Sequence, residues 1–183
     1  MVRSFVFLSA LVFASTAFAQ AYDRNGPALG ASVGFAIEDF DDGGIDFDNS
    51  GAAGATFSYR VHPHIGLEGR FEHTFNFDGN TPFNDVDVNI WNLTANGQIF
   101  FLTGQFQPYF VLGFGIGQAE IDVHGPGGFD DTNTDAVGRV GLGLDSYVTP
   151  NVVVGLEGIY NFGFGDMDDF NYASLEALLK YRF

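Results

Sequence analysis

The side chains that could do chemistry are few, and their spacing is poor for catalysis. The chain contains no cysteine and only four histidines. His73 and His124 have no serine close to them in the sequence that either could activate as a general base. His62 and His64 flank Pro63 without a carboxylate nearby, a weak arrangement for zinc. We therefore expect no enzymatic activity, no bound metal and no cofactor.

A glycine run, Gly113-x-Gly115-x-Gly117, could suggest a phosphate-binding loop. Such a loop needs a following helix and a different spacing of its third glycine. Glycines with a period of two instead indicate a strand face that must stay small. The formal net charge of -16 also argues against nucleic-acid binding through phosphate contacts, so no nucleic-acid partner is expected.

Alternation of apolar and polar residues predicts strands rather than helices. In residues 65–77, for example, Leu67 and Phe71 oppose Glu68 and Arg70, which is the period of two expected of a strand. Eight such segments are predicted: 28–38, 52–61, 65–77, 86–101, 108–121, 137–148, 152–162 and 172–183.

Two segments carry a finer prediction about which way their side chains face. Phe71, Phe75 and Phe77 are all odd-numbered, so we place them on one apolar face. In residues 86–101 the apolar positions are even-numbered up to Ile90 and odd-numbered afterwards. One extra residue near Trp91 would cause this change, so we expect a β-bulge there.

The connections between these segments alternate in length. Short ones at 62–64, 103–107 and 149–151 alternate with longer ones at 39–50, 78–85, 123–135 and 163–170. Short turns on one side and long loops on the other are typical of transmembrane barrels, whose strands need about ten residues to cross the hydrocarbon layer. The pattern predicts an all-β, eight-stranded antiparallel up-and-down transmembrane β-barrel with both termini periplasmic.

A soluble lipocalin-like barrel has the same alternation with its faces exchanged, and side-chain volume separates the two. The interior of an eight-stranded barrel is only wide enough for side chains to fill. One face of the predicted strands is rich in Phe, Leu, Ile and Tyr, whereas the other is largely Gly, Ser, Thr and Asn. The small set fits inside the barrel and the large set does not, which favours the membrane barrel.

Charged residues gather on the same small-residue face. Buried charges must pair with one another, so we expect a cluster of acidic and basic side chains in the lumen. Its predicted members are Arg60, Glu68, Arg70, Glu72, Arg139, Asp145, Glu157, Glu176, Lys180 and Arg182.

The predicted long loops are strongly acidic. Asp39-x-Asp41-x-Gly43 falls short of a full calcium-binding loop, so a solvated, self-repelling rim is favoured over a specific cation site, although bridging by divalent cations to lipopolysaccharide phosphates stays open. The acidic residues assigned to these loops are Asp39, Asp41, Asp42, Asp46, Asp48, Asp78, Asp85, Asp130, Asp131, Asp135, Asp166, Asp168 and Asp169.

The N-terminus reads as a targeting segment. Arg3 precedes an apolar run at residues 5–18, and Ala17-Phe18-Ala19 fits the small-x-small cleavage pattern of a secretory signal peptide. We predict a removable signal peptide at 1–19 and a barrel domain at 20–183.

Three stretches carry a resemblance to small bacterial outer-membrane barrel proteins of the OmpA type. The segment 108–117 resembles their P-Y-x-x-x-G-x-G motif, and 141–157 resembles their sixth strand, turn and seventh strand. Residues 179–183 are similar to their final strand, which ends on an aromatic residue. The resemblance implies the outer membrane of a Gram-negative bacterium as the location, and Tyr181 and Phe183 as the signal read by the barrel-assembly machinery.

The resemblance also bears on the lumen. The family has a lumenal cluster of acidic and basic residues, whose acidic positions match Asp145 and Glu157. Gly155 stands where an arginine is frequent, with Arg139 or Arg182 as candidates to replace it. We expect no peptidoglycan-binding domain of the kind that follows the barrel in OmpA itself.

These observations predict an integral outer-membrane protein with a structural or surface-interaction role and a charge-plugged lumen. The alternative is a narrow, porin-like channel for ions or small solutes. The expected partners are outer-membrane lipid and lipopolysaccharide, the assembly machinery at the C-terminal strand, and an extracellular partner at the loops.

Overall fold

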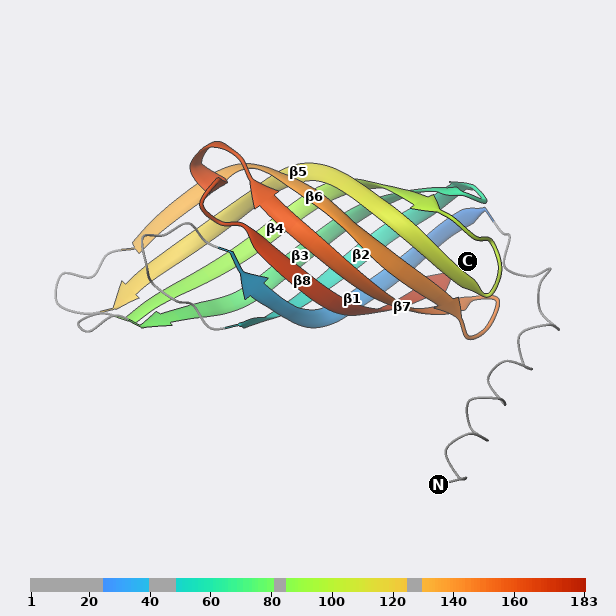
Figure 1. The fold of residues 1–183 in the computed structure, drawn as a ribbon, viewed down its shortest axis with the longest axis horizontal. Helices are drawn as coiled ribbons and strands as arrows, with labels where there is room; N and C mark the ends of the chain where they lie inside the picture. The colour runs from blue at the N-terminus through green and yellow to red at the C-terminus, as the bar shows by residue number, and fades with distance from the viewer. Residues whose placement is uncertain (1–24, 40–48, 81–84, 125–129) are drawn as a thin grey trace, which may run out of the picture.

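The computed structural model describes residues 25–39, 49–80, 85–124 and 130–183. In these ranges eight antiparallel strands pair in chain order, and pairing of the last strand with the first closes a barrel (Figure 1). This confirms the predicted eight-stranded antiparallel up-and-down barrel, whereas the predicted signal peptide lies outside the described residues. The strands are β1 (Gly26–Glu38), β2 (Ser50–His62), β3 (Ile65–Asn80), β4 (Asp85–Phe100), β5 (Phe106–His124), β6 (Asp130–Tyr147), β7 (Val152–Gly163) and β8 (Tyr172–Arg182).

The start of the first strand and the end of the last strand lie on the same side of the molecule. Ala28 near the start of β1 pairs with Arg182 at the end of β8, and we call this side the terminal end. The short β2–β3, β4–β5 and β6–β7 turns lie there too (Figure 1). We call the opposite side, where β1, β3, β5 and β7 end, the distal end. Within the described residues, no helix has the length and hydropathy that crossing a bilayer requires.

Side chains alternate across the barrel wall as their volumes predict. Leu67 is 55% exposed and Phe114 is 59% exposed on the outside, whereas Glu157 is fully buried on the inside. Glycines make room in the lumen: a Cβ on Gly115 would collide with the Leu93 carbonyl of the adjacent strand. Large apolar groups therefore cover the outer wall, as expected for a barrel surrounded by lipid.

The β-bulge predicted near Trp91 is wrong. The pairing of β4 with β5 runs without a break, and the irregularity lies in β3 between Thr74 and Phe77. After this bulge Phe77 points inward and is fully buried, so it does not share the face of Phe71 and Phe75. From Val88 to Phe100 the even-numbered residues of β4 all point inward, and Val88 and Ile90 among them belong to a buried apolar cluster near the distal end.

The strands also reach further at the distal end than the sequence pattern suggested. β6 begins at Asp130, so the β5–β6 hairpin replaces most of the long loop predicted at 123–135 (Figure 1). The register sets Asp78 opposite Asp87, Asp87 opposite Asp122 and Asp122 opposite Asp130. Five acidic residues predicted in loops therefore belong to strands: Asp78, Asp85, Asp130, Asp131 and Asp135.

Candidate functional site

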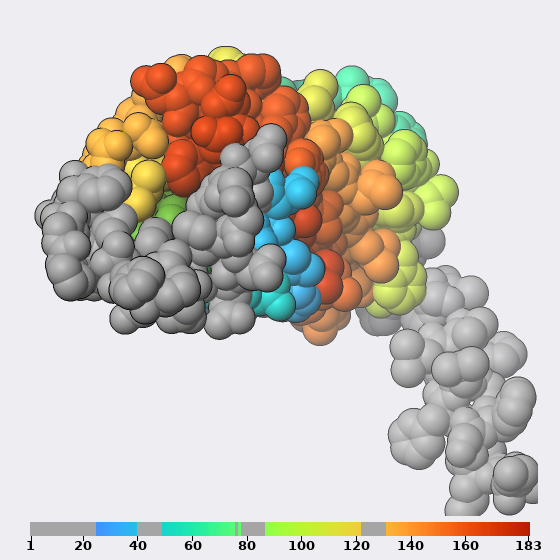
Figure 2. Space-filling model, turned by 60° about the vertical axis from the view of Figure 1, so that its left-hand side comes forward, coloured from blue at the N-terminus to red at the C-terminus, as the bar shows by residue number. Residues whose placement is uncertain are grey.

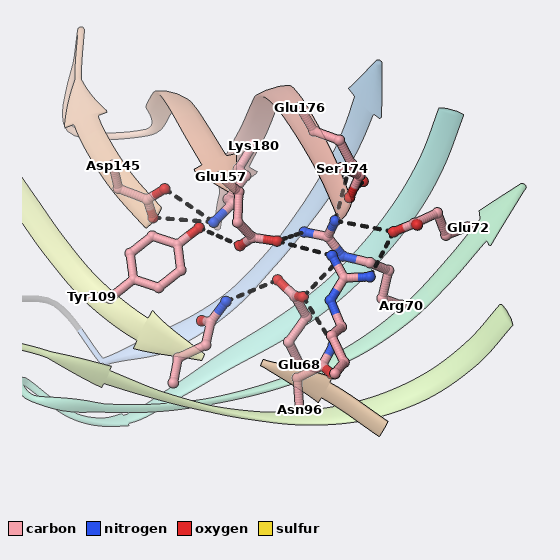
Figure 3. Close-up of polar contacts among 12 residues, drawn as sticks. Glu68, Arg70, Glu72, Asn96, Tyr109, Asp145, Glu157, Ser174, Glu176 and Lys180 are labelled. Atoms are coloured by element: carbon pink, nitrogen blue, oxygen red, sulfur yellow. Dashed lines mark hydrogen bonds and ion pairs between the residues drawn. The ribbon is translucent and has the colours of Figure 1, made fainter. Parts of the chain in front are cut away.

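Arg70 is the hub of an ion-pair network that fills the middle of the lumen (Figure 3). Its Nη2 lies 2.7 Å from Glu157 Oε1, and its Nη1 lies 2.9 Å from Glu176 Oε2. Its Nε lies 3.2 Å from Glu68 Oε1, and Glu72 Oε2 is 3.7 Å from Nη1. Because these carboxylates come from β3, β7 and β8, the network links opposite sides of the barrel.

Arg139 on β6 is the second cation of this layer. Its Nη1 donates to Glu72 Oε2 at 2.5 Å and its Nη2 donates to Glu157 Oε1 at 3.0 Å. The residue is fully buried. Glu72 and Glu157 are therefore shared between two guanidinium groups, and we call Arg70, Arg139 and their four glutamates the ionic layer.

Neutral side chains saturate the carboxylates of the ionic layer. Asn96 and Gln98 donate to the two oxygens of Glu68 at 3.2 and 3.0 Å. The Tyr172 hydroxyl donates to Glu72 at 3.0 Å and the Tyr109 hydroxyl donates to Glu157 at 2.5 Å. Such additional hydrogen bonds are what make buried ion pairs tolerable, because every lone pair removed from water needs a replacement donor. All four donors occupy strand positions whose side chains alternate toward the lumen, so the sequence pattern alone could have identified them.

A separate ion pair lies next to the ionic layer. Lys180 Nζ contacts both oxygens of Asp145, at 3.0 and 3.1 Å. Gly155 is the strand partner of Asp145, and a Cβ there would come within 2.8 Å of the carboxylate. Lys180 of β8 supplies the cation for Asp145, whereas Arg139, one of the two arginines expected to replace the missing one, pairs with Glu157.

Two arginines occupy the terminal mouth of the lumen. Arg60 donates to the Pro63 carbonyl at 2.7 Å and to Gln107 Oε1 at 3.0 Å, and its guanidinium carbon lies 3.3 Å from the centre of the Phe100 ring. Arg182 donates to the Tyr147 hydroxyl. Cation–π contact and hydrogen bonding thus hold both groups against the barrel wall.

A cluster of buried hydrocarbon side chains lies inside the distal mouth. The β7–β8 connection contains a short helix, η2 (Gly165–Met167), whose Met167 is 1% exposed. Asp135 Oδ2 accepts from the Asp166 amide, which ties this connection to β6. Figure 2 brings the distal end forward and shows the connection, in orange-red, standing on the rim. We call the buried group below it the apolar cap: Ala36, Phe77, Val88, Ile90, Ala119, Val137, Met167 and Tyr172.

The structure places all ten predicted lumenal residues inside the barrel, each almost completely buried. It brings six together in the ionic layer, pairs Asp145 with Lys180, and sets Arg60 and Arg182 at the terminal mouth. The apolar cap was missed by the sequence reasoning. Met167 lies in a connection without periodicity, so no pattern marks it as buried.

The histidine pair of the β2–β3 turn makes local contacts. The His64 amide donates to His62 Nδ1 at 3.3 Å, and His64 Nδ1 lies 2.7 Å from the Phe100 carbonyl oxygen. Across the described ranges, no group of three or more potential ligands is arranged to hold a metal ion. The Asp39-x-Asp41-x-Gly43 segment extends beyond the described residues.

The C-terminal aromatic residues lie on the outer wall. Tyr181 and Phe183 are 52% and 67% exposed, and their rings meet edge-on with centroids 5.3 Å apart. The Phe183 amide donates to the Pro27 carbonyl at 3.2 Å, so the last residue stays attached to β1.

The family description "Outer membrane protein beta-barrel domain" matches residues 5–183. This chain belongs to that family. It is an outer-membrane protein of a Gram-negative bacterium. No curated protein matches its sequence.

Solved outer-membrane barrels share the fold of this family member. Neisserial surface protein A has a TM-score of 0.70 and 19% identity, over 86% of this chain and 97% of the other. Another similar structure is that of Ail, the attachment invasion locus protein of Yersinia pestis, in complex with the heparin analogue sucrose octasulfate. It has a TM-score of 0.60 and 21% identity, over 86% of this chain and 99% of the other. OprG of Pseudomonas aeruginosa has a TM-score of 0.54 and 14% identity, over 88% of this chain and 99% of the other.

Proposed function

We propose that this outer-membrane barrel has a structural or surface-interaction role and that its lumen does not conduct. The observation that carries the proposal is the presence of two buried clusters inside the lumen, the ionic layer and the apolar cap. A permeating ion would have to displace buried, hydrogen-bonded ion pairs and then cross hydrocarbon, and both steps are costly. The roles of the ten lumenal residues in this proposal are to plug the barrel, and none is catalytic.

We orient the barrel with both termini in the periplasm and the distal end outside the cell. The short turns at the terminal end support this, because outer-membrane barrels keep short turns on the periplasmic side. The exposed aromatic pair Tyr181 and Phe183 then lies near the periplasmic interface, where the assembly machinery would read the final strand. Outer-membrane lipid and lipopolysaccharide would cover the apolar wall.

The charge of the distal end bears on an extracellular partner. After position 24 the chain contains only five Lys and Arg residues, and all five are lumenal. The polysulfated sugar named with Ail is a poor ligand for a surface without basic side chains. Charge complementarity instead favours a partner that presents positive charge.

Planar-bilayer recording of the refolded protein tests the closed lumen. We expect no single-channel steps from preparations whose gel mobility changes on boiling, the sign of a folded barrel. Reproducible steps altered by Glu68→Gln or Arg182→Gln would establish the alternative, a narrow channel. That alternative draws on one observation, the glycines and small residues that line β1 and β2 on the lumenal side.

Removal of connections tests the surface role. A variant lacking residues 40–48 should fold, because these residues lie between β1 and β2, and it should lose binding to any extracellular partner of the parent protein. Partner binding that survives loss of every distal connection would contradict the surface role.

A further inference from the structure

We propose that a hollow in the outer wall of the barrel binds one acyl chain of lipopolysaccharide. The hollow spans four adjacent strands, β6, β7, β8 and β1 (Figure 1). It offers about 660 Å³ of space, within the range of about 300–1,000 Å³ that is typical of ligand pockets. The site rests on the proposed orientation of the barrel and is independent of whether the lumen conducts.

Two small residues form the floor of the hollow. Gly158 lies between Leu142 and Leu175 in one row across the strands, and Ala173 lies between Tyr160 and Ile37 in the next row toward the distal end. Gly158 and Ala173 are therefore diagonal neighbours with larger outward side chains around them. A Cβ on Gly158 would meet no atom within 4 Å, so the space above it is open.

Tyr160 sets the distal limit of the hollow. Its hydroxyl donates to Asp39 Oδ2 at 2.7 Å. Because Tyr160 belongs to β7 and Asp39 follows β1, the tyrosine side chain crosses β8, where the small Ala173 leaves it room. Tyrosines with an apolar ring and a polar tip gather where the hydrocarbon of a bilayer meets its headgroups. The hollow therefore lies just on the hydrocarbon side of that boundary.

The surroundings of the hollow select a hydrocarbon chain. Phe35, Leu142 and Leu175 beside it are exposed on the outer wall, which faces lipid in an outer-membrane barrel. The hollow is continuous with this wall, and none of the described residues that line it is charged. With the distal end outside the cell, the adjacent leaflet is the outer one. Its lipid is lipopolysaccharide, so the chain at hand is one of the lipopolysaccharide acyl chains.

Packing gives a chain in the hollow an advantage over the lipid around it. Within a bilayer every site is apolar, so association depends on close packing rather than on the hydrophobic effect. A chain on the rest of the wall touches the tips of protruding side chains such as Leu67. In the hollow it would lie against Gly158 with Leu142, Tyr160 and Leu175 around it, and its dispersion contacts increase accordingly.

Native mass spectrometry of the full-length barrel, released from detergent micelles that contain purified lipid A, tests the site. We expect a complex with one lipid A molecule in the parent protein. Gly158→Leu should lose that complex, because the leucine fills the hollow without changing any charge. The change in gel mobility on boiling checks that each variant is folded.

Gly97→Leu is the matched control and should bind lipid A as the parent does. Gly97 lies on the outer wall of β4, away from the hollow, and a Cβ there would meet only the Leu112 carbonyl oxygen, at 3.8 Å. Loss of the complex in this variant as well would mean that any added leucine on the wall disturbs lipid binding, which would overturn the site.

A second set of micelles, with phosphatidylethanolamine in place of lipid A, identifies the source of the chain. We expect no stable complex there. Absence of the lipid A complex in the parent, its persistence in Gly158→Leu, or equal retention of the phospholipid would overturn the site. The closed lumen has its own test in the bilayer recordings, and an epitope inserted in residues 40–48 and probed on intact cells tests the orientation separately.

Discussion

The ionic layer and the apolar cap lie one above the other in the same lumen, yet they close it by different physics. The ionic layer depends on Arg70 and Arg139 reaching glutamates on other strands at fixed distances. The apolar cap depends on burial of hydrocarbon, which is non-directional. The middle of the barrel is therefore specific and intolerant of change, whereas the distal mouth is adaptable.

The largest expected effect is that of Arg70→Met. Removing the hub leaves up to four buried glutamates short of positive charge, and breaking a buried ion pair on one side costs about 3–5 kcal/mol. We expect at least that loss in the free energy of unfolding, measured by urea titration in lipid vesicles. A loss below about 1 kcal/mol, the range of exposed pairs, would show that the network is hydrated.

Lys180→Met should come next. It leaves Asp145 buried beside Gly155 without its cation, and we expect a loss of about 3 kcal/mol in the same titration. The double variant Lys180→Met with Asp145→Leu removes both charges and should recover most of the loss. Additive effects of the two substitutions would mean that the pair is not coupled.

Met167→Ala tests the apolar cap. Truncating a buried methionine costs about 2–5 kcal/mol in a rigid core, and a connection at the rim can relax, so we expect about 2 kcal/mol. Because the ionic layer stays intact, bilayer recordings should still show no steps. Conduction in this variant would make the apolar cap the sole barrier.

The smallest expected effect is that of Gly158→Ala on the outer wall. A Cβ at Gly158 meets open space, so the free energy of unfolding should change by less than about 0.5 kcal/mol. Gly115→Ala is the matched lumenal variant, where overpacking should cost about 1–3 kcal/mol. Equal effects at the two glycines would contradict the inside and outside faces assigned here.

Strand number, strand order and facing could be predicted from the sequence because alternation reports them directly. Prediction failed where one face changes its chemistry along the barrel. Val88 and Ile90 are apolar but point inward. Because every apolar residue was expected to point outward, their parity predicted a β-bulge that β4 does not have.

The charged residues of the lumen were predictable as a set but not as pairs. Parity places Lys180 and Asp145 on the same face, while their contact depends on the register between β6, β7 and β8. Likewise, acidic residues such as Asp130 looked like loop residues because strand propensity is low for aspartate. Backbone pairing with β5 overrides that preference.

The position of Arg70 has a consequence for how the barrel assembles. Glu68 and Glu72 are its neighbours on β3, but Glu157 and Glu176 arrive only with the last two strands. Until those strands dock, the guanidinium must keep its hydration shell. The guanidinium therefore loses its hydration shell at the same time as β1 pairs with β8 and closes the barrel. A partly closed barrel is then an unfavourable, short-lived species.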